Sequence, residues 1–183
     1  MGDEVTREVS PDAPTVLVSA GSKHGATTEI AARIGQALAK HGCQVVETPP
    51  GGVEDLDRFD AIVLGSAVYA GRWTSDAMGL AERVSALEKP PPVWIFSSGP
   101  VGDPLKPEED PVDAAEARTL TGAREHRIFA GKIDRTRLSL GEKAIVIALR
   151  APEGDFRDWD AIDAWGDVLA TEILAQAVRP PAN

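Results

Sequence analysis

The sequence has one cysteine, one tyrosine and no long apolar run among its 183 residues, and these shortages exclude several classes of protein. The single cysteine, Cys43, excludes an intramolecular disulfide and a metal or iron–sulfur site built from several cysteines. No stretch reaches the roughly 18 consecutive apolar residues of a membrane-spanning helix, so we expect no integral membrane segment. The formal net charge of -10 argues against nucleic acid and anionic lipid as main partners. As a separate expectation, we place the protein in the cytoplasm.

The two ends of the sequence differ in composition from the part between them. Residues 1–13 are polar and acidic, and they predict a disordered leader because they have too little apolar surface to offset the entropy of ordering. Residues 14–178 alternate apolar runs with helical patterns and predict one domain. Residues 179–183 remain as a short tail.

Apolar runs and helical periodicity alternate along this domain. Continuous β-branched runs predict buried strands over 15–19, 44–48, 61–65, 93–96 and 127–130. Helical stripes predict a helix that ends at Gly42 and others over 74–88, over 112–121 and from about residue 158 onward. The apolar stretch 141–150 fits a strand or a helix, and its position favours a helix. We therefore predict an α/β protein with a doubly wound five-stranded parallel sheet of order 2-1-3-4-5.

In such a sheet a ligand binds outside the carboxyl ends of the strands, at the switch point between the first and third strands. The loop after the first strand contains six candidate phosphate-binding residues, which are Ser22, Lys23, His24, Gly25, Ala26 and Thr27. A helix N-terminus offers N–H groups and a favourable dipole to a phosphate, and short hydroxyls add donors. The alternative is that Thr27 or Thr28 only caps the helix.

The stretches after the third and fourth strands contain candidates for a planar ligand. Tyr69 and Trp73 offer aromatic faces for stacking, and Ala67 and Val68 lie beside them. The alternative is that Trp73 packs against the following helix and that Tyr69 is a surface residue. The small residues that follow the fourth strand would contact the edge of the ligand, unless they form a plain turn; they are Ser97, Ser98 and Gly99.

Other polar groups in the sequence carry weaker signals. The three histidines are scattered and predict no metal site, and no Ser-His-Asp arrangement or other catalytic residue is evident. The run from Asp155 to Asp160 predicts a turn that caps the last helix. The acidic stretch Asp103–Asp113 predicts a solvated, mobile loop.

Taken together, these segments resemble the flavodoxin-like family. Residues 16–31 resemble its first strand, phosphate loop and first helix, with His24 where a hydroxyl residue often stands. Residues 59–73 and 126–134 resemble the branch that contains the bacterial menaquinone-dependent protoporphyrinogen IX oxidase. In that branch a long insertion follows the fifth strand, and the corresponding stretch 135–156 is shorter here.

The resemblance implies FMN as cofactor, with its phosphate on residues 22–27, its ring framed by residues 67–69 and 73, and its pyrimidine edge at residues 97–99. It also implies an FMN-dependent oxidoreductase, whose flavin accepts hydride without help from a side-chain acid or base. One alternative is a non-catalytic electron carrier that exchanges electrons with a small-molecule or protein redox partner. The other is a protein of this fold that binds a deazaflavin or no cofactor.

Overall fold

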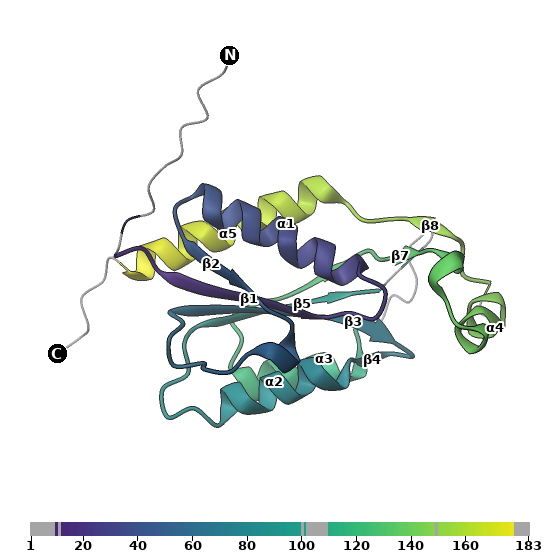
Figure 1. Cartoon of the computed structure of the whole chain (residues 1–183), viewed down its shortest axis with the longest axis horizontal. Coiled ribbons are helices and arrows are strands. Elements are labelled where there is room, and N and C mark those ends of the chain that lie inside the picture. The colour runs from purple at the N-terminus through teal and green to yellow at the C-terminus, as the bar shows by residue number, and fades with distance from the viewer. Residues whose placement is uncertain (1–9, 11, 100, 102–109, 149, 178–183) are drawn as a thin grey trace, which may run out of the picture.

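The computed structural model describes residues 10, 12–99, 101, 110–148 and 150–177. It is a three-layer α/β sandwich, with α1 (Ala26–Lys40) and α5 (Trp159–Ala177) on one face of the central sheet. The helices α2 (Ser75–Ser85) and α3 (Val112–Thr121) cover the other face (Figure 1). The expected acidic leader, the tail at 179–183 and most of the loop 103–113 lie outside the described residues.

The central sheet confirms the predicted topology. Its parallel strands follow the order β2-β1-β3-β5-β6, which is the predicted 2-1-3-4-5 once the added strand β4 is set aside. Their bounds are Thr15–Gly21 for β1, Gln44–Glu47 for β2, Ala61–Tyr69 for β3, Val93–Ser98 for β5 and His126–Phe129 for β6. The short β4 (Arg72–Trp73) pairs antiparallel with the end of β3. A helical turn, η1 (Pro50–Gly52), follows β2.

Successive side chains of a strand point to opposite faces of the sheet, and this alternation divides the core into two layers. Val16 and Val18 of β1 face α1 and α5, where Trp165 is buried, whereas Leu17 faces Leu80 of α2. The helices α1 and α5 pack closely because Gly166 has no side chain. A Cβ atom at this position would lie 2.6 Å from the Cβ of Ala37.

The strands β3 and β5 are longer than the sequence suggested. Residues 66–69 and 97–98 were expected in loops, but they pair in register as Ser66 with Ser97 and Ala67 with Ser98. Gly65 is the physical reason for the error, because it signals a turn in the sequence but lies inside β3 here. A Cβ atom on Gly65 would lie 2.1 Å from the ring of Phe96, so this glycine makes room for an aromatic side chain on the neighbouring strand.

An excursion separates β6 from α5. It runs through β7 (Lys132–Ile133), the helical turn η2 (Arg135–Arg137), α4 (Leu140–Ala148) and β8 (Gly154–Asp155). The helix favoured for 141–150 is confirmed, while the antiparallel pair β7–β8 was not predicted. Figure 1 shows α4 at the end of the molecule, beyond β7 and β8, and none of its described residues is buried. Among the described helices, none combines the length and the apolar character needed to cross a membrane.

Candidate functional site

The loop between β1 and α1 ends in a helix start that no side chain caps. Gly25 is the N-cap residue of α1 and has a φ of 87°, a left-handed conformation that favours glycine. Thr27 lies inside the first turn and is 2% exposed, so the alternative in which Thr27 or Thr28 caps the helix is wrong. The Ser22 hydroxyl accepts a hydrogen bond from the N–H of Gly25 at 3.1 Å and closes the loop. The first-turn N–H groups of α1 are thus oriented for an anion.

The start of α2 supports the same loop from the other side. Gly21 ends β1 against Thr74, and a Cβ atom on Gly21 would lie 1.8 Å from the Thr74 hydroxyl oxygen. The N–H of Thr74 in turn donates to the hydroxyl of Ser66 on β3 at 2.9 Å. The β1–α1 loop therefore lies on a backbone that is fixed by β3 and α2.

Tyr69, at the end of β3, lies directly against this loop. The ammonium group of Lys23 lies 4.6 Å from the centroid of the Tyr69 ring, and the His24 ring approaches the same tyrosine edge-on at 6.2 Å. Burial raises the pKa of the Tyr69 phenol above its ordinary value. A cleft of about 330 Å³ opens here, and its lining residues are Ser22, Lys23, Tyr69, Trp73, Thr74, Ser75 and Asp76. Its volume is within the usual range for small-molecule sites.

Trp73 belongs mainly to the core. Its side chain is 5% exposed within the α2–α3 layer, and its indole N–H donates to the Ser97 hydroxyl at 2.8 Å. The backbone N–H of Trp73 donates to the buried carboxylate of Asp113 at 3.1 Å. This is the packing position that we considered as the alternative for Trp73, although one edge of the residue also lines the cleft.

The remaining candidates lie along the carboxyl edge of β3 and β5. Ala67, Ser97 and Ser98 are buried, so their side chains do not reach the surface at this edge. Gly99 packs closely on Val68, since a Cβ atom on Gly99 would lie 3.0 Å from the Val68 Cβ. The structure thus brings Ser22, Lys23 and His24 together with Tyr69, and Val68 together with Gly99.

The sequence analysis missed the part of the site that comes from the excursion. Glu142 of α4 bonds the imidazole Nε2 of His24 at 3.1 Å, and Arg137 donates to the backbone carbonyl oxygen of His24 at 3.1 Å. Ser139 and Glu142 form a capping box, because each binds the backbone N–H of the other. The pattern Ser-x-x-Glu signals this box in the sequence, but it does not say that the glutamate reaches His24.

Hydrogen bonding to the capping box changes the acidity of Glu142. The Ser139 N–H is the main cause, and the Ser139 hydroxyl and His24 add to it; together they lower the pKa of Glu142 from its ordinary value to about 2. Glu142 is therefore ionised at neutral pH, and its carboxylate accepts the hydrogen bond from the His24 ring.

Sequence reasoning also missed Arg157, whose side chain is 2% exposed. Its guanidinium bonds the carboxylates of Asp155 on β8 and Glu29 on α1, and it donates to the carbonyl oxygen of Ala26 at 3.1 Å. It also lies 4.5 Å from the Trp159 ring centroid. The hydrogen bond with Asp155 is the main reason why the pKa of Arg157 is raised and that of Asp155 is lowered. Arg157 thus fixes the start of α1 relative to the excursion.

A doubly wound parallel sheet with a glycine-containing loop at its switch point defines a flavodoxin-like α/β fold. A family model described as a flavodoxin domain matches residues 17–160, so the chain belongs to the flavodoxin domain family. A search of curated protein sequences finds no match.

Solved structures share the fold at low sequence identity. A flavodoxin from the domain Archaea has 16% identity and a TM-score of 0.60, and the match covers 87% of this chain and 99% of the other. Flavodoxin 1 from Bacillus cereus has 13% identity and a TM-score of 0.58, with 88% and 97% covered. Rubredoxin oxygen:oxidoreductase from Desulfovibrio gigas has 13% identity and a TM-score of 0.62, with 92% of this chain but only 38% of that longer chain covered.

Proposed function

We propose that the protein binds FMN at the carboxyl edge of β1 and β3 and carries electrons in the manner of a flavodoxin. One observation supports this most strongly: the uncapped start of α1, with its loop at 22–27, lies against Tyr69 at the switch point in a member of the flavodoxin domain family. Flavodoxins and a rubredoxin oxygen:oxidoreductase are among the solved structures that share its fold.

The residues present fit FMN at both ends. The phosphate would bind to the first-turn N–H groups of α1 and to the hydroxyls of Ser22 and Thr27, since no side chain occupies the cap position. The ring would lie beside Tyr69, with Val68 and Gly99 forming the close-packed edge of the sheet next to it. The buried Ala67, Trp73, Ser97 and Ser98 would support this edge from below.

Bound FMN would supply the one-electron and two-electron chemistry, and the chain would supply binding, orientation and electrostatics. The net charge of -10 disfavours additional negative charge and so would lower the potential at which the flavin is reduced. The same charge would attract a basic redox partner and accelerate the encounter with it.

A second candidate is an FMN-dependent oxidoreductase of the protoporphyrinogen oxidase branch, which acts on a small molecule. The resemblance of residues 59–73 and 126–134 to that branch supports it. The position of α4 also supports it, because this apolar helix comes next to the loop through His24 and Glu142. Turnover of porphyrinogens with a quinone acceptor would distinguish this enzyme from a carrier.

The first test is an absorption spectrum of the purified protein, followed by titration with FMN. We expect visible flavin bands or tight FMN uptake with quenched flavin fluorescence. The variant Tyr69→Ala should weaken quenching because it removes the stacking face, whereas Tyr69→Phe keeps an aromatic face at the same position and should retain it. A colourless protein that takes up no FMN would contradict the proposal.

A further inference from the structure

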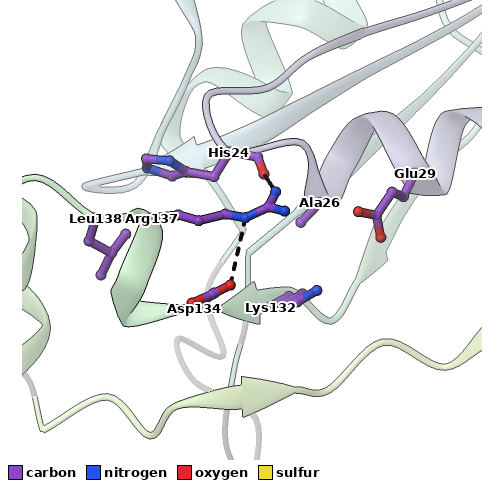
Figure 2. Close-up of a pocket in the computed structure, with 7 residues that line it drawn as sticks. All are labelled: His24, Ala26, Glu29, Lys132, Asp134, Arg137 and Leu138. Carbon is purple, nitrogen blue, oxygen red and sulfur yellow. Dashed lines mark hydrogen bonds and ion pairs between the residues drawn. The ribbon is translucent and has the colours of Figure 1, made fainter.

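The excursion between β6 and α5 places a guanidinium group on the β1–α1 loop. Arg137, at the end of η2, donates from Nη1 to the carbonyl oxygen of His24 at 3.1 Å. A Cβ atom on Gly25 would lie 3.8 Å from the same Nη1 atom. Figure 2 shows the guanidinium between the His24 carbonyl and Asp134, beside Ala26 at the start of α1. A cation from a segment more than a hundred residues away thus lies next to the N–H groups that start α1.

Two carboxylates lie near this guanidinium, and only one of them pairs with it. Glu29 pairs with the buried Arg157 at 2.7 Å. Asp134 accepts a hydrogen bond from the N–H of Thr136 at 3.0 Å, and it lies 3.6 Å from Nε of Arg137. Asp134 therefore orients the guanidinium through its Nε edge, and Nη2 has no hydrogen-bond partner within the described ranges of the chain. The small cavity that contains these groups also includes Lys132, a second cation (Figure 2).

The loop itself lacks a cation in this place. Lys23 is the only lysine or arginine between residues 21 and 27, and its ammonium group lies over the Tyr69 ring, toward the cleft. Backbone N–H groups and hydroxyls donate hydrogen bonds to a phosphate, but they do not neutralise its charge of nearly two units. In a protein with a net charge of -10, a phosphate meets additional repulsion, and a nearby cation offsets part of it.

We propose that Arg137 is a specificity-determining residue whose guanidinium pairs with the flavin phosphate and makes the site select FMN over the unphosphorylated riboflavin. The inference rests on the proposed function of the site. The hydrogen bond from Arg137 to the His24 carbonyl and the bond from Glu142 to the His24 ring hold the loop and the excursion in register. The selection of FMN that we assign to Arg137 is electrostatic and acts on the phosphate end of the flavin.

The test compares the affinities of the full chain for FMN and for riboflavin, both measured by quenching of flavin fluorescence. Arg137→Gln should weaken FMN binding roughly tenfold and leave riboflavin binding within about twofold, because only FMN carries the charge that Arg137 pairs with. Arg137→Lys, which keeps the charge, should recover part of the loss. The matched control is Arg135→Gln, in the same helical turn, because Arg135 faces Glu153 instead of the loop and should change neither affinity.

The possible outcomes separate this inference from the proposed function. Arg137 is 58% exposed, so its variants should keep the melting temperature of the wild type, which is measured in parallel. Wild-type binding of FMN together with an unchanged ratio of the two affinities in Arg137→Gln would overturn the role of Arg137 alone. An equal loss for both flavins would also overturn it, since it would indicate a structural effect. Failure of the wild type to bind either flavin would overturn the proposed function and this inference with it.

Discussion

The carboxylate of Glu142 bonds the imidazole of His24 at 3.1 Å across 118 positions of sequence, and this bond ties the excursion to the β1–α1 loop. The hydrogen bond from Arg137 to the carbonyl oxygen of His24 adds to it. The imidazole of His24 thus faces a carboxylate of α4. The loop therefore depends on a segment that the five-stranded core does not include.

Glu142 should make the stability of the protein depend on pH in the acid range. Its pKa is about 2 in the folded protein and near 4.5 without these contacts, so its stabilising effect is complete above pH 4.5 and disappears as pH falls toward 2. The melting temperature of the wild type should therefore fall more steeply between these pH values than that of Glu142→Gln. Thermal unfolding followed by circular dichroism measures both curves. Parallel curves for the two proteins would contradict the assignment.

His126 should produce a second dependence on pH, nearer neutrality. Its Nε2 atom lies 2.8 Å from the Ser97 hydroxyl, which already accepts the indole N–H of Trp73. The hydroxyl keeps one proton to donate and one lone pair to accept with, so the roles in this hydrogen bond depend on the tautomer of His126. Burial is the main cause that lowers the pKa of His126, Arg118 lowers it further and Asp110 opposes the shift.

A lowered histidine pKa means that the folded state binds the proton less well than the unfolded state. The contribution of His126 to stability is complete above its unfolded pKa of about 6.5 and is lost as pH falls toward its folded value. The wild type should thus lose melting temperature between pH 7.5 and pH 5.5, by roughly a few degrees, and His126→Gln should lose less over the same interval. The control variant is His41→Gln, which removes an exposed histidine on the surface. A His126→Gln curve with the wild-type slope would refute the buried neutral form.

Arg157 and Arg33 offer a direct comparison of a buried and an exposed ion pair on α1. The Arg157 side chain is 2% exposed and bonds two carboxylates, whereas Arg33 and its partner Asp163 are 45% and 37% exposed. Arg157→Ala should lower the free energy of unfolding by about 2 kcal/mol, because it removes the cation that anchors β8 to α1. Arg33→Ala should cost less than about 1 kcal/mol. Urea unfolding measures the free energy of unfolding of both variants. Equal losses would show that the ion pairs of Arg157 contribute no more to stability than an exposed pair does.

The layers and the strand order of this fold are predictable because each depends on local patterns. A β-branched run buried on both faces predicts a parallel strand wherever it occurs, and helical stripes such as that of Ile162 and Leu169 predict the face that meets the sheet. The position of the β1–α1 loop was likewise predictable, since Gly25 and Ser22 act within a few positions of each other.

The parts that were not predictable depend on contacts between distant residues. Arg157 looks like one charge in an acidic turn, and only the fold brings it to Glu29 and the carbonyl oxygen of Ala26. Glu142 and Arg137 reach His24 for the same reason. Capping of α5 was predictable because it is local: the Asp158 carboxylate accepts the N–H of Ala161, three positions along, at 3.0 Å.

Gly65 shows how a contact between distant residues can override a local signal, because a glycine expected at a turn instead lies inside β3 against Phe96. A methyl group at this position would lie 2.1 Å from the Phe96 ring, so Gly65→Ala should lower the free energy of unfolding by about 2 kcal/mol through overpacking. The φ of Gly65 does not lie in the left-handed region, so its backbone conformation does not exclude a side chain. The penalty therefore comes from the contact with the Phe96 ring. The double variant Gly65→Ala/Phe96→Leu should therefore be more stable than the sum of its single variants predicts. Urea unfolding of the four proteins in this cycle measures the coupling. An additive result would mean that Gly65 is required for its backbone and not for the space it leaves to Phe96.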